Sequence, residues 1–161
     1  MTLVFNASPV IILAKAGLLD QLAALGNHVI VPQAVIEEVT RIDNPGDPAR
    51  IWLENPSCSV LRPASPPISS FLAAWDLGAG ETAVIAIAAN TPDAVAVLDD
   101  LAARRCAQAH GIEVMGSLGL ALLAKKRGVI PNVGKALDAI VAAGLFIAPR
   151  HLVAIREQAG E

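Results

Sequence analysis

Short aliphatic runs alternate with longer amphipathic segments along this chain, and this alternation limits the folds open to it more than any other feature. The clearest run, residues 94–98, has the length and composition of a strand that is buried on both faces. Other strands are expected at 2–5, 28–31, 59–61 and 112–114; helices at 8–15, 17–25, 33–41, 49–54, 78–90, 101–110, 116–127 and 133–143; and a last short element near 145–155. The order indicates βαβ units, so we predict an α/β fold, a three-layer α/β/α sandwich around a mainly parallel sheet.

The composition is that of one domain with an aliphatic core. Apolar residues make up 54% of the 161 residues, charged residues 17% and aromatic residues 3%, which excludes disordered and fibrous classes. The chain has no repeat, low-complexity tract or clear linker. We therefore expect residues 1–161 to form a single domain, with residues 131–161 as a helical tail.

No segment has the form of a membrane span or a secretory signal. The longest apolar runs, such as 114–124, reach about half of the roughly 20 residues that a spanning helix needs. The N-terminus has no basic region before its apolar stretch and no evident cleavage site. Cys58 and Cys106 are isolated and are best interpreted as free thiols of a reducing compartment. We therefore expect a cytoplasmic protein.

The formal net charge of −3 is the result of two unequal halves. Residues 1–100 carry a balance of −7, whereas residues 101–161 carry +4. Two interpretations stay open: an ordinary solvated surface, or an acidic site beside a basic docking surface.

Acidic and amide side chains follow the expected strands. They are Asn6 after the first strand, Glu37 and Glu38 in the helix after the second, Glu81 in the first turns of helix 78–90, and Asp99 and Asp100 after the 94–98 strand. Ligands bind at the carboxyl ends of parallel strands, and carboxylates gathered there favour a cation such as Mg²⁺ or Mn²⁺. Each residue also has a structural alternative: Asp99, Asp100 and Ser117 can cap helices, and Glu81 can offset a helix dipole.

Other site classes are not supported. The segment 78–83 fits the dinucleotide pattern GxGxxA, but a helix-like segment precedes it and Glu81 would meet the pyrophosphate. The patterns of P-loop proteins, α/β-hydrolases, zinc proteases and zinc deaminases are absent. A receiver domain requires an acidic pair after the first strand, where this chain has Asn6-Ala7-Ser8.

Five segments, in order, resemble a PIN domain. They are residues 4–11, 31–39, 77–82, 97–107 (with Asp99-Asp100 and Arg104-Arg105) and 115–119 (Met-Gly-Ser-Leu-Gly). More narrowly, they look like a prokaryotic subfamily close to the VapC-type toxins, and the resemblance covers roughly residues 2–130. It implies a sheet with helices on both faces and a metal-dependent ribonuclease site of three or four acids.

The resemblance also implies roles for single residues. It places Asn6 at the first-strand aspartate, Glu38 at the acid of the second helix, Glu81 at the central-helix acid and Asp100 at the fourth-strand acid, with Asp99 as the reserve. In this reading Glu38, Glu81 and Asp100 hold Mg²⁺ or Mn²⁺, and Asn6, Asp99 or Ser117 add neutral or water-mediated contacts. Asn6 departs from the family pattern, because an amide oxygen brings no negative charge and should lower metal affinity.

Two functions are therefore expected to compete. The first is a metal-dependent endoribonuclease that hydrolyses RNA phosphodiester bonds, as the toxin of a toxin–antitoxin pair; the second is a catalytically weak or inactive RNA- or protein-binding module. Five basic residues are candidates for the RNA backbone or are simply solvated, dipole-matching charges: Arg104, Arg105, Lys125, Lys126 and Arg127. Few aromatic residues are available for base stacking, so sequence-tolerant binding of single strands by stacking platforms is not supported. Expected partners are RNA, an antitoxin protein and a second copy of the chain, which would dimerise through the apolar segments 9–13 and 116–124.

Overall fold

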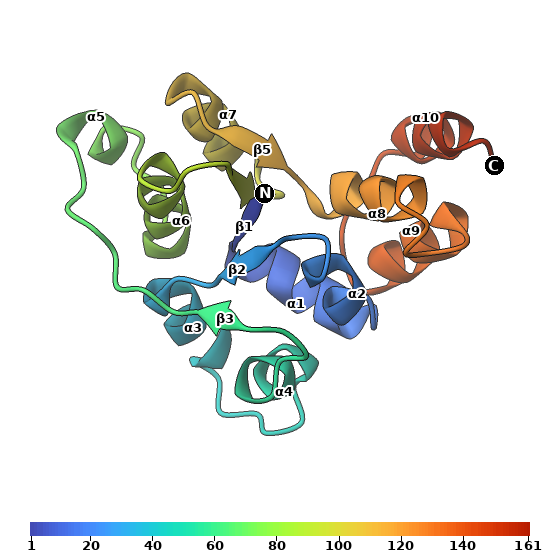
Figure 1. Ribbon diagram of the computed structural model, residues 1–161, viewed down its shortest axis with the longest axis horizontal. Coiled ribbons are helices and arrows are strands. Elements are labelled where there is room, and N and C mark those ends of the chain that lie inside the picture. Colours follow the sequence, from blue (N-terminus) through green and yellow to red (C-terminus); the bar gives the residue numbers. More distant parts are fainter.

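A sheet of five parallel strands forms the centre of the computed structural model, which describes residues 1–161 (Figure 1). Its strands are β1 (Thr2–Phe5), β2 (His28–Ile30), β3 (Val60–Leu61), β4 (Ala94–Val97) and β5 (Glu113–Met115). They are arranged in the order β3-β2-β1-β4-β5, and every neighbouring pair is parallel. The predicted α/β class is confirmed, with a sheet that is wholly rather than mainly parallel.

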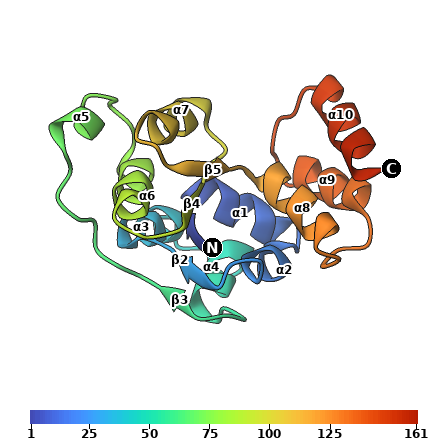
Figure 2. The ribbon, with the colours of Figure 1, turned by 45° about the horizontal axis from the view of Figure 1, so that its top comes forward.

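Ten helices surround the sheet. They are α1 (Ala7–Lys15), α2 (Leu19–Ala23), α3 (Gln33–Thr40), α4 (Pro48–Glu54), α5 (Ser70–Ala73), α6 (Ala79–Ala89), α7 (Leu101–Ala109), α8 (Ser117–Lys126), α9 (Val133–Ala142) and α10 (Pro149–Ala159). α6 and α7 contact each other on one face of the sheet, whereas α1 and α4 pack together on the other (Figures 1 and 2). α8, α9 and α10 lie together at one end of the molecule.

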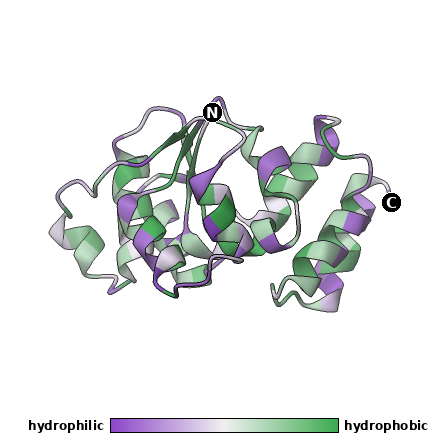
Figure 3. Ribbon diagram, turned by 90° about the horizontal axis from the view of Figure 1, so that it is seen from below, coloured by the Kyte–Doolittle hydropathy of each residue, from purple (hydrophilic) through white to green (hydrophobic).

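The strands are apolar because both of their faces are covered. Leu3, Val4 and Phe5 of β1 are fully buried, as are Ala96 and Val97 of β4. The strands are accordingly green, and thus hydrophobic, in Figure 3, while the helices carry both colours. A buried strand of this kind reads as a continuous aliphatic run, which is why the sequence pattern located it.

The strand order reverses between β1 and β4. From the central strand β1 the chain proceeds outward to β2 and β3, and it then returns to add β4 and β5 on the other side. The backbone N–H of Asn6 donates to the carbonyl oxygen of Val97 at 3.2 Å, so the carboxyl ends of β1 and β4 lie side by side. In open parallel sheets ligands bind in the crevice outside this reversal.

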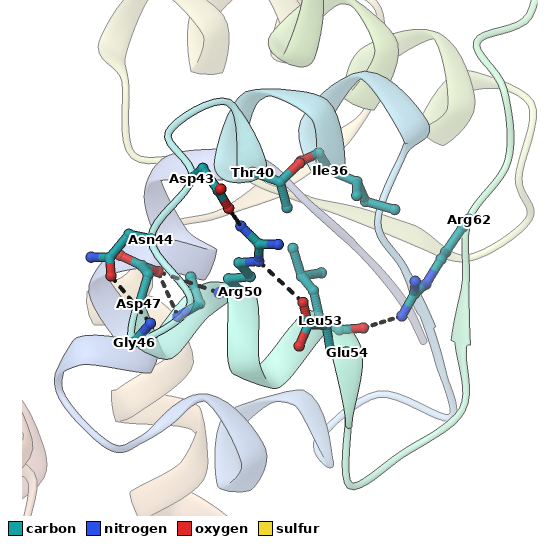
Figure 4. Close-up of polar contacts among 11 residues, drawn as sticks. Ile36, Thr40, Asp43, Asn44, Gly46, Asp47, Arg50, Leu53, Glu54 and Arg62 are labelled. Atoms are coloured by element: carbon teal, nitrogen blue, oxygen red, sulfur yellow. Dashed lines mark hydrogen bonds and ion pairs between the residues drawn. The ribbon is translucent and has the colours of Figure 1, made fainter.

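A polar network stabilises α4 and the loop that connects it to α3 (Figure 4). Glu38 lies on α3. Arg50 donates to Asp43 at 2.6 Å and to Glu54 at 3.1 Å. Asp47 caps α4 by accepting from the N–H groups of Ala49 and Arg50, and Arg62 donates to the carbonyl oxygen of Leu53. These contacts hold the segment that follows α3, and α3 itself contacts both α4 and α6.

The end of the chain differs from the sequence expectation. Instead of a short element near 145–155, the structure has an 11-residue helix, α10, that begins at Pro149. Proline suits the first turn of a helix because the missing N–H has no partner there. Most other elements agree with the predicted ones to within a few residues at their ends.

Glu161 attaches the end of α10 to α9. Its two carboxylate oxygens accept from the N–H groups of Val133 and Gly134, each at 2.8 Å, and Lys125 approaches at 3.0 Å. The hydrogen bonds from Gly134 and Val133, helped by Lys125, lower the pKa of Glu161 to about 2. A second ion pair, Arg156 with Asp138 at 2.6 Å, joins the same two helices.

We expect this attachment to depend on pH. Because the pKa of Glu161 is lower in the folded protein, its contribution is fully present above the ordinary value of 4.5 and is lost as the pH falls toward about 2. At pH 6, Glu161→Gln should speed amide hydrogen exchange at Val133 and Gly134 relative to wild type, whereas Glu157→Gln should not. The difference should shrink below pH 4.5 and vanish once the pH falls below about 2. Equal exchange of wild type and Glu161→Gln at pH 6 would contradict the attachment.

The apolar segments expected at a dimer interface are largely used inside the protomer. Pro9, Val10, Ile12 and Leu13 of α1 are buried, as are Leu120, Ala121 and Ala124 of α8. Their hydrophobicity is therefore mostly explained by core packing, and the homodimer stays a prediction.

Cys106 is buried, Cys58 is partly buried, and both are free thiols. None of the ten helices has the length and apolar character needed to cross a membrane.

Candidate active site

Asn6 stands at the carboxyl end of β1 with a buried, unpaired oxygen. The residue is 5% exposed, and its side chain does not cap the helix α1 that follows. Its Oδ1 atom is buried and has no hydrogen-bond partner. Leaving a buried amide oxygen without a partner is costly, so this atom is best explained by a ligand that binds it.

Glu38 approaches the same place from α3. A Cβ atom added to Gly80 would lie 2.7 Å from Glu38 Oε2 and 3.1 Å from Asn6 Oδ1. Gly80 is buried in the first turn of α6, and its missing side chain leaves room between the two oxygens. The neighbouring Glu37 points elsewhere: its carboxylate accepts from Gln33 at 3.3 Å on the exposed side of α3. This divergence follows from the turn of about 100° between successive helical residues.

Glu81 lies beside Gly80 and caps the helix. Its Oε2 accepts from the backbone N–H of Gly78 at 3.0 Å, before the first turn of α6. The structural alternative for this residue, a favourable interaction at the helix N-terminus, is therefore present. The carboxylate nevertheless stays at the end of α6 that faces Asn6 and Glu38.

Asp99 connects the ends of β4 and β5. Its Oδ1 accepts from the Ser117 N–H at 2.8 Å, and its Oδ2 accepts from the Ser117 hydroxyl at 2.7 Å. Ser117 is fully buried at the start of α8. A Cβ atom on Gly116 would lie 2.9 Å from Arg104 Nη1 and 3.0 Å from Asp99 Oδ1, so both side chains approach the space over this glycine.

Asp100 makes a different contact from Asp99. It is exposed, and its Oδ2 accepts from the Ala103 N–H at 2.9 Å, which makes it the N-cap of α7. Of the two adjacent aspartates, Asp99 contacts the neighbouring strand end and Asp100 caps the following helix.

The acidic residues thus form two groups along one edge of the sheet. Asn6 and Glu38 lie on either side of the space over Gly80, with Glu81 at Gly78 at the start of the same helix, and Asp99 and Arg104 lie near Gly116 with Ser117 bonded to Asp99. No three His, Cys, Asp or Glu side chains are close enough together to hold a metal ion as they stand. The oxygen donors fit Mg²⁺ or Mn²⁺ in kind, because these ions prefer carboxylate, amide and water oxygens.

The five basic residues have different surroundings. Lys125 donates to the carbonyl oxygen of Pro131 and pairs with Glu161, and Arg127 donates to the carbonyl oxygen of Leu25 at 2.9 Å. Arg105 and Lys126 are exposed, and Arg104 lies beside Asp99. The structural alternative therefore applies most clearly to Lys125 and Arg127.

Sequence reasoning missed the role of two glycines. Gly80 belongs to the GxGxxA pattern that we rejected as a dinucleotide site, yet it makes space between Asn6 and Glu38. Glycine within a helix costs about 1 kcal/mol relative to alanine, so its presence in a first turn was a signal of close approach. Gly116 makes similar space beside Asp99 and Arg104.

The fold is a wholly parallel α/β fold, and its candidate site consists of carboxylates and the Asn6 amide near the reversal of strand order. The family model described as a PIN domain matches residues 2–161, and the chain belongs to the PIN-domain family. PIN domains are generally nucleases and typically use divalent metals. The match continues past residue 130 through the C-terminal helices. No curated protein and no solved structure matched the chain.

Proposed function

We propose that this protein is a metal-dependent endoribonuclease that hydrolyses RNA phosphodiester bonds, close to the VapC-type toxins. The main supporting observation is the buried, unpaired Oδ1 of Asn6, which shares the space over Gly80 with the Glu38 carboxylate. Two oxygens of these types, at the crevice where parallel sheets bind ligands, suit a divalent cation.

In this proposal Asn6, Glu38 and Glu81 hold Mg²⁺ or Mn²⁺, and Asp99 completes the set from the adjacent strand, with Asp100 as the alternative. Asp99 is preferred because it is directed to the neighbouring strand end, whereas Asp100 caps α7. A bound divalent ion supplies an activated water nucleophile and stabilises the leaving oxygen.

The remaining residues orient the substrate and the acids. Ser117 donates two hydrogen bonds to Asp99 and so fixes the direction of its carboxylate. Arg104 places a guanidinium next to Asp99, where it can bind a phosphate oxygen through charge-assisted hydrogen bonds.

The direct test is cleavage of a mixed RNA panel by the purified chain with Mg²⁺, with Mn²⁺ and with EDTA. We expect cleavage within the RNA in either metal and none in EDTA. Cleavage that persists in EDTA, or none at high protein concentration with either metal, would contradict the nuclease.

A catalytically weak binding module is the second candidate. Two observations favour it: Asn6 brings no negative charge, and no three His, Cys, Asp or Glu side chains stand close enough together to hold a metal ion. Calorimetric titration with Mn²⁺ separates the two, because a nuclease site should take up the ion near millimolar concentration and a degraded site should not.

Restoring the charge at position 6 should strengthen metal binding. Asn6→Asp places a carboxylate where the unpaired amide oxygen lies, and added ligand charge should tighten Mn²⁺ binding on the order of tenfold. Asn44→Asp, in the exposed loop before α4, is the matched control and should leave the affinity unchanged. Unaltered Mn²⁺ affinity of Asn6→Asp would place the metal elsewhere.

A toxin role requires a partner that restrains the nuclease. A short adjacent gene encoding a DNA-binding protein would support it, and a gene without such a neighbour would favour a solitary nuclease or adaptor. The homodimer is tested separately by sedimentation, where a 16.6 kDa species alone would exclude it.

A further inference from the structure

A cavity of about 690 Å³ opens beside the Asp99 half of the candidate site. One wall comes from α7, β5 and α8, and the opposite wall comes from residues 145–148 and the start of α10. We propose that this cavity is a subsite for one unpaired nucleotide of single-stranded RNA. The proposal rests on the proposed ribonuclease function and adds the form of the substrate.

Phe146 provides a surface on which a base can stack. It lines the cavity and is 93% exposed, the highest exposure of any large apolar residue in the protein. Leu101 of α7 lines the same cavity and is 60% exposed. Two large apolar side chains left in water around one cavity indicate a ligand with a flat apolar face, and a nucleobase has one.

The other aromatic residues are not available for this purpose. Phe5 and Trp52 are buried, Trp75 is partly buried, and Phe71 packs against the ring of His110 with centroids 4.7 Å apart. The low aromatic content argued against stacking platforms distributed over a surface. It leaves room for a single stacking position beside the acidic edge.

The polar side chains around the cavity suit a phosphate. Arg104 and His151 line it, one from α7 and the other from α10, and Asp99 is the one acidic residue in the lining. Arg104 lies next to Asp99 over Gly116, so a phosphate bound there would be at the edge where the acids stand. A base on Phe146 and a phosphate on Arg104 would extend the RNA from the cavity toward the proposed metal.

The wall formed by the tail is attached to the body of the protein. Glu161, just after α10, accepts from the N–H groups of Val133 and Gly134 in α9. Arg156 of α10 pairs with Asp138 of α9, so both contacts join α10 to α9. These contacts hold the helix on which His151 lies. A cavity of this volume falls within the range of small-ligand sites, roughly 300 to 1,000 Å³.

Single-stranded RNA fits better than duplex RNA, because a paired base stays within its stack and cannot enter the cavity. A hydrophobic protein segment is the competing occupant. The Arg104 guanidinium and the His151 imidazole beside an exposed phenylalanine favour the nucleotide, and the experiment below separates the two.

The test measures binding of a fluorescently labelled single-stranded RNA by anisotropy in EDTA, where the metal-dependent reaction cannot proceed. Phe146→Ala should weaken binding by at least about fivefold, and Phe146→Trp should retain it. Phe146→Leu keeps apolar bulk without the aromatic face and should resemble Phe146→Ala. Arg104→Gln should weaken binding and lower its salt dependence. Phe71→Ala removes an exposed phenylalanine far from the cavity and should bind as wild type.

The outcomes separate this subsite from the nuclease itself. Equal binding by wild type and Phe146→Ala, or duplex RNA bound as tightly as single strands, would overturn the subsite even if RNA is cleaved with metal. A loss caused equally by Phe146→Ala and Phe146→Leu, with no cleavage in any metal, would uphold the subsite and reject the nuclease. Retention of binding by Phe146→Leu would overturn stacking and favour a purely apolar occupant such as a protein segment.

Discussion

Glu38→Gln should lower RNA cleavage by about a hundredfold or more at a fixed Mg²⁺ concentration, since loss of a charged ligand removes several kcal/mol of metal-assisted stabilisation. The change keeps the size of the side chain and removes only its charge. The carboxylate oxygen that lies over Gly80 opposite Asn6 is the one affected. Initial cleavage rates of wild type and variant, measured over a range of metal concentrations, provide the comparison.

Glu37→Gln is the matched control because it makes the same chemical change one residue away. Glu37 points to Gln33 on the exposed side of α3, so its variant should cleave at the wild-type rate. Equal losses in both variants would show that α3 contributes general negative charge rather than one metal ligand. Full activity of Glu38→Gln would remove this residue from the site.

Gly80→Ala should nearly abolish metal binding and cleavage while the protein stays folded. The added methyl group would lie 2.7 Å from Glu38 Oε2 and 3.1 Å from Asn6 Oδ1, and it would therefore fill the space between the two oxygens. We expect a loss of about a hundredfold in cleavage, similar to removal of a ligand. Mn²⁺ calorimetry and cleavage rates measure the two effects separately.

Thermal unfolding distinguishes this local effect from misfolding. Alanine is favoured over glycine in a helix by about 1 kcal/mol, which offsets the cost of moving the flexible end of Glu38. The unfolding temperature of Gly80→Ala should thus stay close to that of wild type. Gly46→Ala is a suitable control, because its new methyl group would meet only Asn44 Oδ1 at an ordinary 3.5 Å. Unchanged Mn²⁺ affinity in Gly80→Ala would mean that no metal binds over this glycine.

The two variants also separate the two candidate functions. A nuclease must lose cleavage in both, whereas a binding module with a degraded site has no metal-dependent activity to lose. RNA binding in EDTA should survive both changes, since the cavity around Phe146 is lined by other residues.

Most of the fold could be predicted because its signals are local. The aliphatic run that contains β4 reflects burial of the strand. The alternation of strands with helices reflects hydrophobic periodicity, which depends on residues close in sequence. The helix α10 was underestimated because none of its residues is fully buried, and its apolar stripe is limited to the partly buried Leu152, Ile155 and Ala159.

The site could be predicted only in part. Asn6 and Glu38 were named from the sequence, but the preference for Asp99 over Asp100 rests on Ser117, which lies 18 residues beyond Asp99 and donates two hydrogen bonds to its carboxylate. The sequence likewise contains no sign that Lys125 and Arg127 have partners. In the structure Lys125 pairs with Glu161, and Arg127 donates to the carbonyl oxygen of Leu25.

The sequence by itself determined the residue types at the strand ends, the parallel α/β class and the departure from an acid at Asn6. The tertiary structure alone decided that Gly80 separates Asn6 from Glu38, and that Phe146 and His151 face Arg104 across a cavity. The physical reason is that strand order and helix packing bring together residues that are distant in the chain. The periodicity of a helix or strand relates only residues that are close in sequence. It predicts which face of its own element a side chain lies on, but not which residues of other elements it contacts.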